Sequence, residues 1–135
     1  MKECARCHGR CRAVRSYDLE GKLLWSFRGM SSITIPTPCA GGGLLFISSG
    51  YVGDPLRPLY AIRPGASGDL TLATGQTQSA YIAWSHRAIG PYNPSPLYYE
   101  GRLYVLYDRG LVSCFEASSG RRLYEREPLP NSLAF

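Results

Sequence analysis

The chain has 135 residues and a mass of 14.9 kDa, which leaves room for one domain with one sizeable core. Hydrophobic residues make up 44% and charged residues 19%, as in ordinary globular proteins, so the composition excludes a chain that is disordered throughout. The net charge is +5, and outside an arginine-rich N-terminal stretch the basic residues are scattered among expected turns and strand ends, so we do not expect nucleic-acid binding. No run of about twenty apolar residues occurs, so we do not expect a transmembrane helix either.

Residues 1–12 form a segment rich in cysteine and arginine. Cys4, Cys7 and His8 have the C-x-x-C-H spacing of covalent haem attachment, and together with Cys11 they are ligand types that suit a tetrahedral zinc site. A haem needs an enclosing apolar pocket, which a segment this short does not offer, and the compact spacing leaves little loop to close a zinc shell. We therefore expect a disordered leader that binds neither group. It lacks the apolar stretch of a secretory signal.

Beyond the leader, short apolar runs bounded by Gly, Pro, Asp and Ser recur about every ten residues, and helical periodicity is missing. This pattern predicts an all-β protein. In chain order, the expected strands cover residues 13–17, 23–28, 33–37, 44–49, 58–63, 81–86, 103–107, 111–115 and 122–126.

The runs repeat one another. "TPCAGGGLLFIS" matches "SPLYYEGRLYVL" at a constant offset of 58 positions, and "YDLEGKLLW" is matched by "FEASSGRRLY" in its aromatic, acidic and glycine positions. A stretched copy of the second pattern ends on Trp84, 59 positions after Trp25. Repeated strand–turn–strand units predict β-propeller blades, which are four-stranded antiparallel sheets that need neighbours to cover their faces. Trp25, Trp84 and Tyr124 are then expected as apolar plugs between blades.

The units resemble the quinoprotein-type β-propeller, whose pyrroloquinoline-quinone-like repeat reads as a strand, "G.LY..D..G" and then "L.A.DA.TGK..W". "GRLYVLYDRGLVSCFEASSGRRLY" follows this unit, "SYDLEGKLLW" follows its second half, and "GGGLLFISSG" with "PLYAIRP" follows its first half. The resemblance covers residues 13–135. Full rings of about eight blades need well over 300 residues, so the resemblance implies a partial propeller of two to three blades.

The resembled family contains quinone-dependent dehydrogenases and non-catalytic propellers, and both kinds are exported, which leaves the compartment of this chain open. The enzymes use a pair of adjacent cysteines, a tryptophan under the quinone ring, a calcium ion held by Glu and Asn, and an Asp base. Here Cys39 and Cys114 are solitary, and the asparagines are Asn93 and Asn131. We therefore expect no quinone or calcium site.

Other candidate sites are equally incomplete. His86 lies in an expected strand, and no G-x-S-x-G motif accompanies it. The three glycines of "CAGGGLL" lead into a strand, so they predict a hairpin turn and not a phosphate loop at a helix start. Asp69 in "GASGDL" is a single carboxylate, too few for a calcium loop, and this stretch predicts an insertion that lengthens a hairpin. No catalytic, cofactor-binding or metal residue is predicted.

The sequence thus favours a non-catalytic propeller segment that serves as a protein-interaction scaffold. Loops 50–58 and 64–79 would lie on its rims, with exposed Tyr and Arg side chains as anchors. Open blade edges predict a protein partner or self-association. The alternatives are a fragment of a quinone- or haem-linked oxidoreductase whose other blades are absent, and a gene fragment with no independent role.

Overall fold

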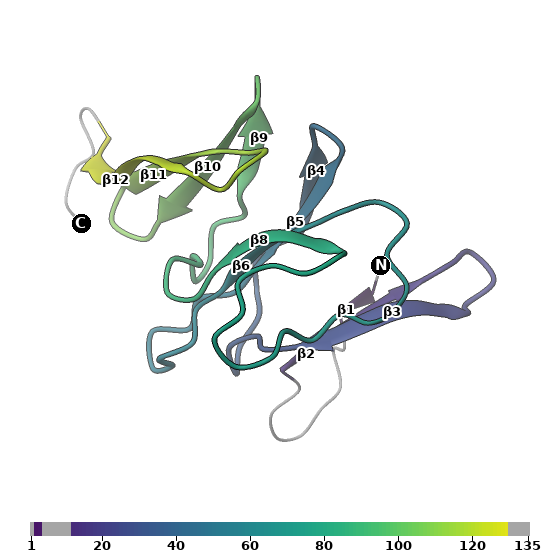
Figure 1. Ribbon diagram of the computed structural model, residues 1–135. Helices are drawn as coiled ribbons and strands as arrows, with labels where there is room; N and C mark the ends of the chain where they lie inside the picture. The colour runs from purple at the N-terminus through teal and green to yellow at the C-terminus, as the bar shows by residue number, and fades with distance from the viewer. Residues whose placement is uncertain (1, 4–11, 130–135) are drawn as a thin grey trace.

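The computed structural model describes residues 2–3 and 12–129, and in these ranges the regular secondary structure consists of β-strands, which confirms the all-β prediction. The strands form three four-stranded sheets (Figure 1). The N-terminal sheet has the order β1 (Lys2–Glu3), β2 (Ala13–Tyr17), β3 (Leu23–Arg28), β7 (Gly68–Asp69). The central sheet has the order β4 (Cys39–Gly41), β5 (Leu44–Ser48), β6 (Leu59–Ile62), β8 (Ile82–His86). The C-terminal sheet has the order β9 (Leu97–Tyr99), β10 (Arg102–Tyr107), β11 (Leu111–Glu116), β12 (Arg122–Pro128).

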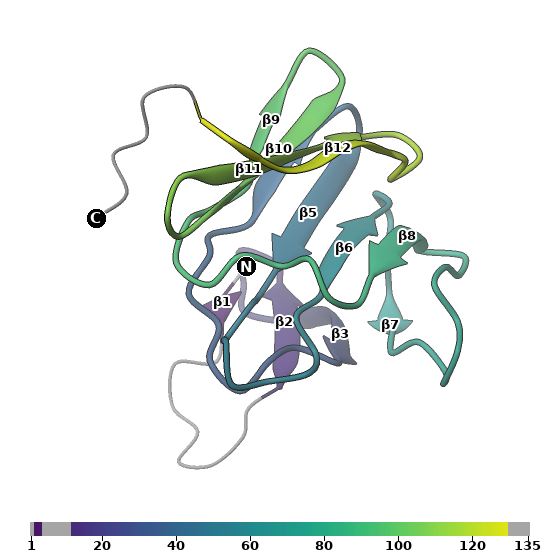
Figure 2. The same cartoon turned by 90° about the vertical axis from the view of Figure 1, so that its left-hand side faces the viewer.

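Strand pairing is antiparallel throughout the central and C-terminal sheets. In the N-terminal sheet β1, β2 and β3 are antiparallel, and β7 pairs with β3 in parallel. The three sheets follow one another without closing into a ring (Figures 1 and 2). The arrangement is therefore an open series of propeller-like blades. Among the described residues no helix is long and apolar enough to cross a membrane.

Two apolar layers hold the three sheets together. The layer between the N-terminal and central sheets includes Val14, Trp25, Phe27, Ile47 and Ile62. The layer between the central and C-terminal sheets includes Phe46, Trp84, Leu103, Val105 and Phe115. Successive side chains of a strand point to opposite faces, so the central sheet contributes to both layers and each outer sheet to one. The central sheet is covered on both faces, and each outer sheet has one face that no described sheet covers.

The aromatic plugs predicted between blades are present at two of three positions. Trp25 is buried in the first layer, beside Phe27. Trp84 is buried in the second layer, where its Nε1 donates a hydrogen bond to the Ala117 carbonyl oxygen at 2.9 Å. Tyr124 is 37% exposed, because it lies on the outer face of the C-terminal sheet.

Two matching hairpins confirm the repeat in backbone geometry. The predicted hairpin turn after β4 is confirmed, with Gly42 at φ 59° and Gly43 at φ 77°. The turn between β9 and β10, 58 positions later, has Glu100 at φ 45° and Gly101 at φ 78°. Positive φ at both central residues is the requirement of a type I′ turn, whose twist matches that of the flanking strands.

The prediction of a strand over 33–37 is wrong. Pro36 lies inside this segment and Pro38 follows it, and proline has no N–H to donate to a strand ladder. The segment is irregular and is held by local and long-range bonds: the Ser31 hydroxyl donates to the Ile33 carbonyl oxygen, and the Thr37 N–H donates to Ser95 Oγ. Pairing begins only after Pro38, in β4. The three-residue strands β4 and β9 were not predicted.

The insertion at 64–79 does lengthen a hairpin, since it connects the antiparallel neighbours β6 and β8. It also does something that the sequence did not predict: β7 within it crosses to the N-terminal sheet and pairs with β3. Leu70 is buried in the first apolar layer, and its N–H donates to the Ser26 carbonyl oxygen at 2.8 Å. The insertion therefore ties the N-terminal and central sheets together.

Candidate functional site

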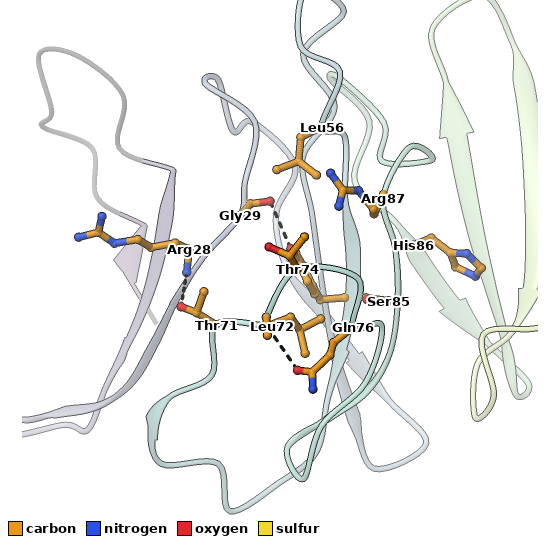
Figure 3. A pocket seen from close by; sticks show the side chains of 12 residues that line it. Arg28, Gly29, Leu56, Thr71, Leu72, Thr74, Gln76, Ser85, His86 and Arg87 are labelled. Atoms are coloured by element: carbon orange, nitrogen blue, oxygen red, sulfur yellow. Dashed lines mark hydrogen bonds between the residues drawn. The ribbon is translucent and has the colours of Figure 1, made fainter.

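A cavity of about 280 Å³, lined by both polar and apolar residues, lies between the end of β3, the insertion and the end of β8. Figure 3 shows how its side chains point: Arg28 extends away from the cavity, and His86 turns away from it toward the C-terminal sheet. Arg87 lies beside Leu56 at the cavity wall. The cationic groups that line the cavity therefore do not converge on a common point.

Several polar groups of the cavity are engaged in holding the insertion in place. Thr71 Oγ1 accepts a hydrogen bond from the Arg28 N–H, and Gln76 Oε1 accepts one from the Ala73 N–H. The Tyr60 hydroxyl donates to the Gly29 carbonyl oxygen at 3.2 Å, and burial raises the pKa of Tyr60 despite the opposing charge of Arg87. The Tyr60 phenol is thus neutral near neutral pH, and its role here is structural.

His86 is occupied by the neighbouring sheet. Its Nε2 lies 2.7 Å from the Gly120 carbonyl oxygen, and its ring packs against Trp84 and Phe115 with ring centroids 5.6 and 5.4 Å away. The cavity lining contains no carboxylate. Within the described residues, the cavity does not assemble the nucleophile and base that hydrolytic catalysis requires.

Most of the residues that the sequence marked as possible ligands lie in parts of the chain that the structure does not describe. Cys4, Cys7, His8, Cys11 and Asn131 lie outside the described residues, as does most of the expected leader, of which Lys2–Glu3 forms β1 and pairs with β2. Within residues 12–129, no group of three or more His, Cys, Asp or Glu side chains is placed to hold a metal ion.

The two described cysteines are free thiols in different sheets. Cys39 is half-buried in β4, and this burial raises the pKa of its thiol, although a backbone hydrogen bond from Tyr98 acts the other way. Cys114 is buried in β11. Of the two asparagines in the chain, Asn93 lies among the described residues, and its Nδ2 donates a hydrogen bond to Asp108 Oδ1 at 3.1 Å.

Both predicted rim loops are anchored to the sheets. In loop 50–58, Asp54 accepts hydrogen bonds from the Ser32 N–H and hydroxyl and pairs with Arg12 at 3.3 Å. These contacts lower the pKa of the Asp54 carboxyl, with the Ser32 hydroxyl bond as the largest cause. In the insertion, Asp69 accepts from the Thr71 hydroxyl and N–H, which lowers the pKa of Asp69 in the same way. Asp54 thus holds loop 50–58 against distant segments of the chain, and Asp69 stabilises a local turn.

An apolar groove of about 580 Å³ runs between the N-terminal and central sheets on the side of their hairpins. Trp25, Leu44 and Pro64 are among its lining residues. Nothing in its shape or charge identifies an occupant.

The outer face of the C-terminal sheet carries a row of apolar and aromatic side chains. One row of paired residues crosses all four strands, and its members are Leu97, Tyr104, Cys114 and Tyr124. Tyr99, Leu106 and Val112 flank the row on the same face, as their pairings require. Leu97 is 61% exposed and Leu106 is 37% exposed. These seven residues are called the outer apolar face below. Arg102 and Glu116, which pair with each other across β10 and β11, lie on the same side of the sheet and border this face with charge.

The outer face of the N-terminal sheet has the opposite character. Its corresponding row joins Arg15 of β2, Ser26 of β3 and Asp69 of β7. Arg28, at the end of β3, is exposed on the same face. The same pairings place Ala13, Tyr17 and Leu23 on this face as well, so it combines charged and hydroxyl side chains with apolar ones. The charged groups are suited to water.

Sequence reasoning placed the interaction surface on the rim loops and did not single out the outer apolar face, although a signal for it exists. β10 reads "RLYVLY", with apolar residues in successive positions, whereas β2 reads "AVRSY" and alternates. A continuous apolar strand is typical of a sheet covered on both faces.

No known protein-family description matches the chain, and no curated protein matches it either. Any statement about its function therefore depends on the geometry described above and on the repeat motifs quoted from the sequence.

Proposed function

We propose that this chain is a segment of pyrroloquinoline-quinone-like β-propeller repeats that acts as a non-catalytic protein-interaction scaffold. Its binding surface is the outer apolar face, and the partner that fits this surface is another β-sheet with an apolar face. Two apolar sheet faces pack about 10 Å apart with interdigitating side chains, as the sheets of this chain do with one another.

The observation that carries this proposal is the position of equivalent residues in successive repeats. Cys39, Phe46 and Trp84 of the central sheet pack against the C-terminal sheet. Their counterparts one repeat later, by the sequence match, are Leu97, Tyr104 and Tyr124. All three counterparts lie on the outer apolar face. Residues that join two sheets in one repeat are thus present, without a described neighbour, in the next.

The aromatic content of the face also favours protein binding. Tyr99, Tyr104 and Tyr124 present large rings with few rotatable bonds, and their hydroxyls can remain in contact with water at the border of an interface. Tyrosine is enriched in protein interfaces for these reasons.

The engagement of the cavity's polar groups in structural bonds favours a role without catalysis. His86 and Tyr60 both bond to backbone carbonyl oxygens of neighbouring segments, so neither is poised as a base toward the cavity.

The proposal is tested with a face variant and a matched control. The face variant, Leu97→Glu with Leu106→Glu, places two carboxylates on the outer apolar face. The control, Leu19→Glu with Val52→Glu, adds the same charge at two exposed apolar positions away from that face. Proteins that bind to the immobilised wild-type chain and to the control, but not to the face variant, are then purified. Their affinity for each of the three chains is measured by calorimetry. We expect direct binding to the wild type, with an affinity that the face variant lowers at least about tenfold.

Equal binding by the wild type and the face variant would remove the outer apolar face from the proposal. The alternative role as part of a quinone-linked oxidoreductase is tested by adding pyrroloquinoline quinone and Ca²⁺. We expect no bound chromophore, and a tightly bound, redox-active visible spectrum would contradict a non-catalytic scaffold.

A further inference from the structure

The C-terminal sheet is electrically balanced, unlike the rest of the chain. Residues 97–129 contain five arginines and five carboxylates, namely Arg102, Arg109, Arg121, Arg122, Arg126 and Glu100, Asp108, Glu116, Glu125, Glu127. The whole net charge of +5 therefore belongs to the residues that precede this sheet. Two copies of a neutral sheet can approach each other without net repulsion, whereas two copies of the N-terminal part repel.

The N-terminal sheet is a poor partner for the outer apolar face. Packing one copy's outer apolar face on another copy's N-terminal sheet would bury Arg15, Arg28 and Asp69 against apolar side chains. Removing charged groups from water without full compensation is costly. Head-to-tail stacking of copies is therefore disfavoured.

The β12 edge of the C-terminal sheet is also protected against strand addition. β12 is exposed along its whole length and contains Glu125, Arg126 and Glu127, and it ends at Pro128. Arg126 has φ 49°, so the strand is locally irregular. Charge, proline and irregularity are the usual means by which edge strands avoid pairing with other chains. The β12 edge therefore disfavours pairing with a partner strand, and β9 at the other edge is only three residues long, so the face of the sheet is the larger surface for a partner.

From these observations we infer that a second copy of this chain covers the outer apolar face, in a two-fold dimer in which the two C-terminal sheets pack face to face. The inference rests on the proposed function, since it names the partner of the same surface. A two-fold contact uses the same patch on both copies and closes after two subunits, so both patches are removed from water at once. Tyr104, in the middle of the sheet, lies near the two-fold axis and Leu97 nearer the border.

Light scattering on a size-exclusion column tests the inference, over roughly 1 to 200 µM protein. We expect the wild type to reach twice 14.9 kDa, and the Leu97→Glu/Leu106→Glu variant to remain at 14.9 kDa with an unchanged circular dichroism spectrum. The Leu19→Glu/Val52→Glu control should form the dimer like the wild type. The Tm of the wild type and the control should rise with protein concentration, and that of the face variant should not.

A wild type that stays at 14.9 kDa over the whole range would overturn the inference, as would a dimer that survives in the face variant or is lost in the control. Masses that grow beyond the dimer with concentration would also overturn it, in favour of an open stack. If the wild type is a monomer but a different protein binds in a manner that the face variant abolishes, the second copy is excluded and the proposed function stands. If the face variant changes neither self-association nor partner binding, both the two-fold dimer and the proposed function are contradicted.

Discussion

The two outer faces of the molecule occupy equivalent positions in the series of sheets and differ most clearly in the row of paired residues that crosses each of them. Across the N-terminal sheet the paired row is Arg15, Ser26 and Asp69, and across the C-terminal sheet it is Leu97, Tyr104, Cys114 and Tyr124. In stacked repeat proteins a terminal unit with a polar outer face acts as a cap. The comparison shows that the row across the N-terminal sheet is charged and polar like such a cap, whereas the row across the C-terminal sheet is apolar and aromatic.

The hairpins of the two outer sheets differ in the same sense. A Cβ atom added at Gly120 would lie 2.4 Å from the Trp84 ring, whereas one added at Gly21 would have no heavy atom within 4 Å. The turn of the C-terminal sheet is packed on the tryptophan of the preceding sheet. The corresponding turn of the N-terminal sheet has no described sheet before it. Gly21 is therefore needed there only for the positive φ of the turn and not for a close contact.

The largest expected change in stability comes from truncating a side chain on the covered face of the C-terminal sheet, compared with one on its open face. Phe115 is fully buried against the central sheet, so Phe115→Ala should lower the free energy of unfolding by about 3–5 kcal/mol. Tyr124→Ala, on the open face, should lower that of the monomer by less than about 1 kcal/mol. Urea unfolding at low protein concentration measures both. Similar losses would mean that the two faces are equally covered in the monomer.

A matched pair of glycine substitutions sharpens the comparison of the hairpins. Gly21→Ala and Gly120→Ala both place a side chain at positive φ, at 86° and 72° respectively, which costs about 1 kcal/mol. Gly120→Ala must in addition displace the Trp84 ring, so we expect its total loss of stability to reach about 2–3 kcal/mol. Thermal unfolding monitored by tryptophan fluorescence gives the difference. Equal losses would show that the contact with Trp84 contributes nothing.

Making the outer face of the N-terminal sheet resemble that of the C-terminal sheet should turn a closed assembly into an open one. Ser26→Leu with Arg28→Leu replaces two of the four polar side chains named on the outer face of the N-terminal sheet and leaves Arg15 and Asp69 in place. Apolar side chains at both ends of the molecule make stacking beyond the dimer less costly. We expect light-scattering masses above that of the dimer, with stability changed by no more than about 1 kcal/mol. Glu20→Leu with Lys22→Leu, at exposed positions of the β2–β3 turn, is the control and should not add mass. Growth in the control as well would contradict the role of the face.

Acid should weaken the contacts around the N-terminal sheet through Asp54 and Asp69. Hydrogen bonds lower the pKa of both carboxyls below the ordinary value of 3.8, so their contribution to stability is present above that pH and is lost as the pH falls through the lowered folded value. Hydrogen exchange is measured at pH 6 and at pH 3 in the wild type and in the Asp54→Asn/Asp69→Asn double variant. Between pH 6 and pH 3, loop 50–58 and the insertion should lose more protection in the wild type than in the double variant. The same pH dependence in both proteins would exclude these carboxyls as its source.

Much of the local structure was predictable because it depends on short-range chemistry. Turn glycines such as Gly43 and Gly101 marked the hairpins, and apolar runs marked the strands that they join. The segment 33–37 was misjudged because its isoleucines suggested a strand while Pro36 removed a necessary donor. β7 escaped prediction because a two-residue strand in a polar loop has no periodicity, and only its parallel partner β3 makes it a strand.

The candidate site was predictable only in part. The sequence argument against an assembled quinone or calcium site drew on solitary cysteines and few asparagines, which are properties of composition. Choosing between the rim loops and a sheet face required knowing which face of β10 the central sheet covers. That choice depends on long-range packing, because Leu103 and Tyr104 are both apolar and point to opposite faces.

By itself, the sequence determined the class of the fold, the repeat, and the positions of most strands and hairpins, since turn chemistry and residue alternation act over a few positions. Only the tertiary structure decided that the insertion bridges two sheets, that His86 is bound to the C-terminal sheet, and that Leu97, Tyr104 and Tyr124 form one open face. Those outcomes depend on which sheet lies against which. Pairing and stacking between residues far apart in the chain carry no short-range pattern from which they could be read.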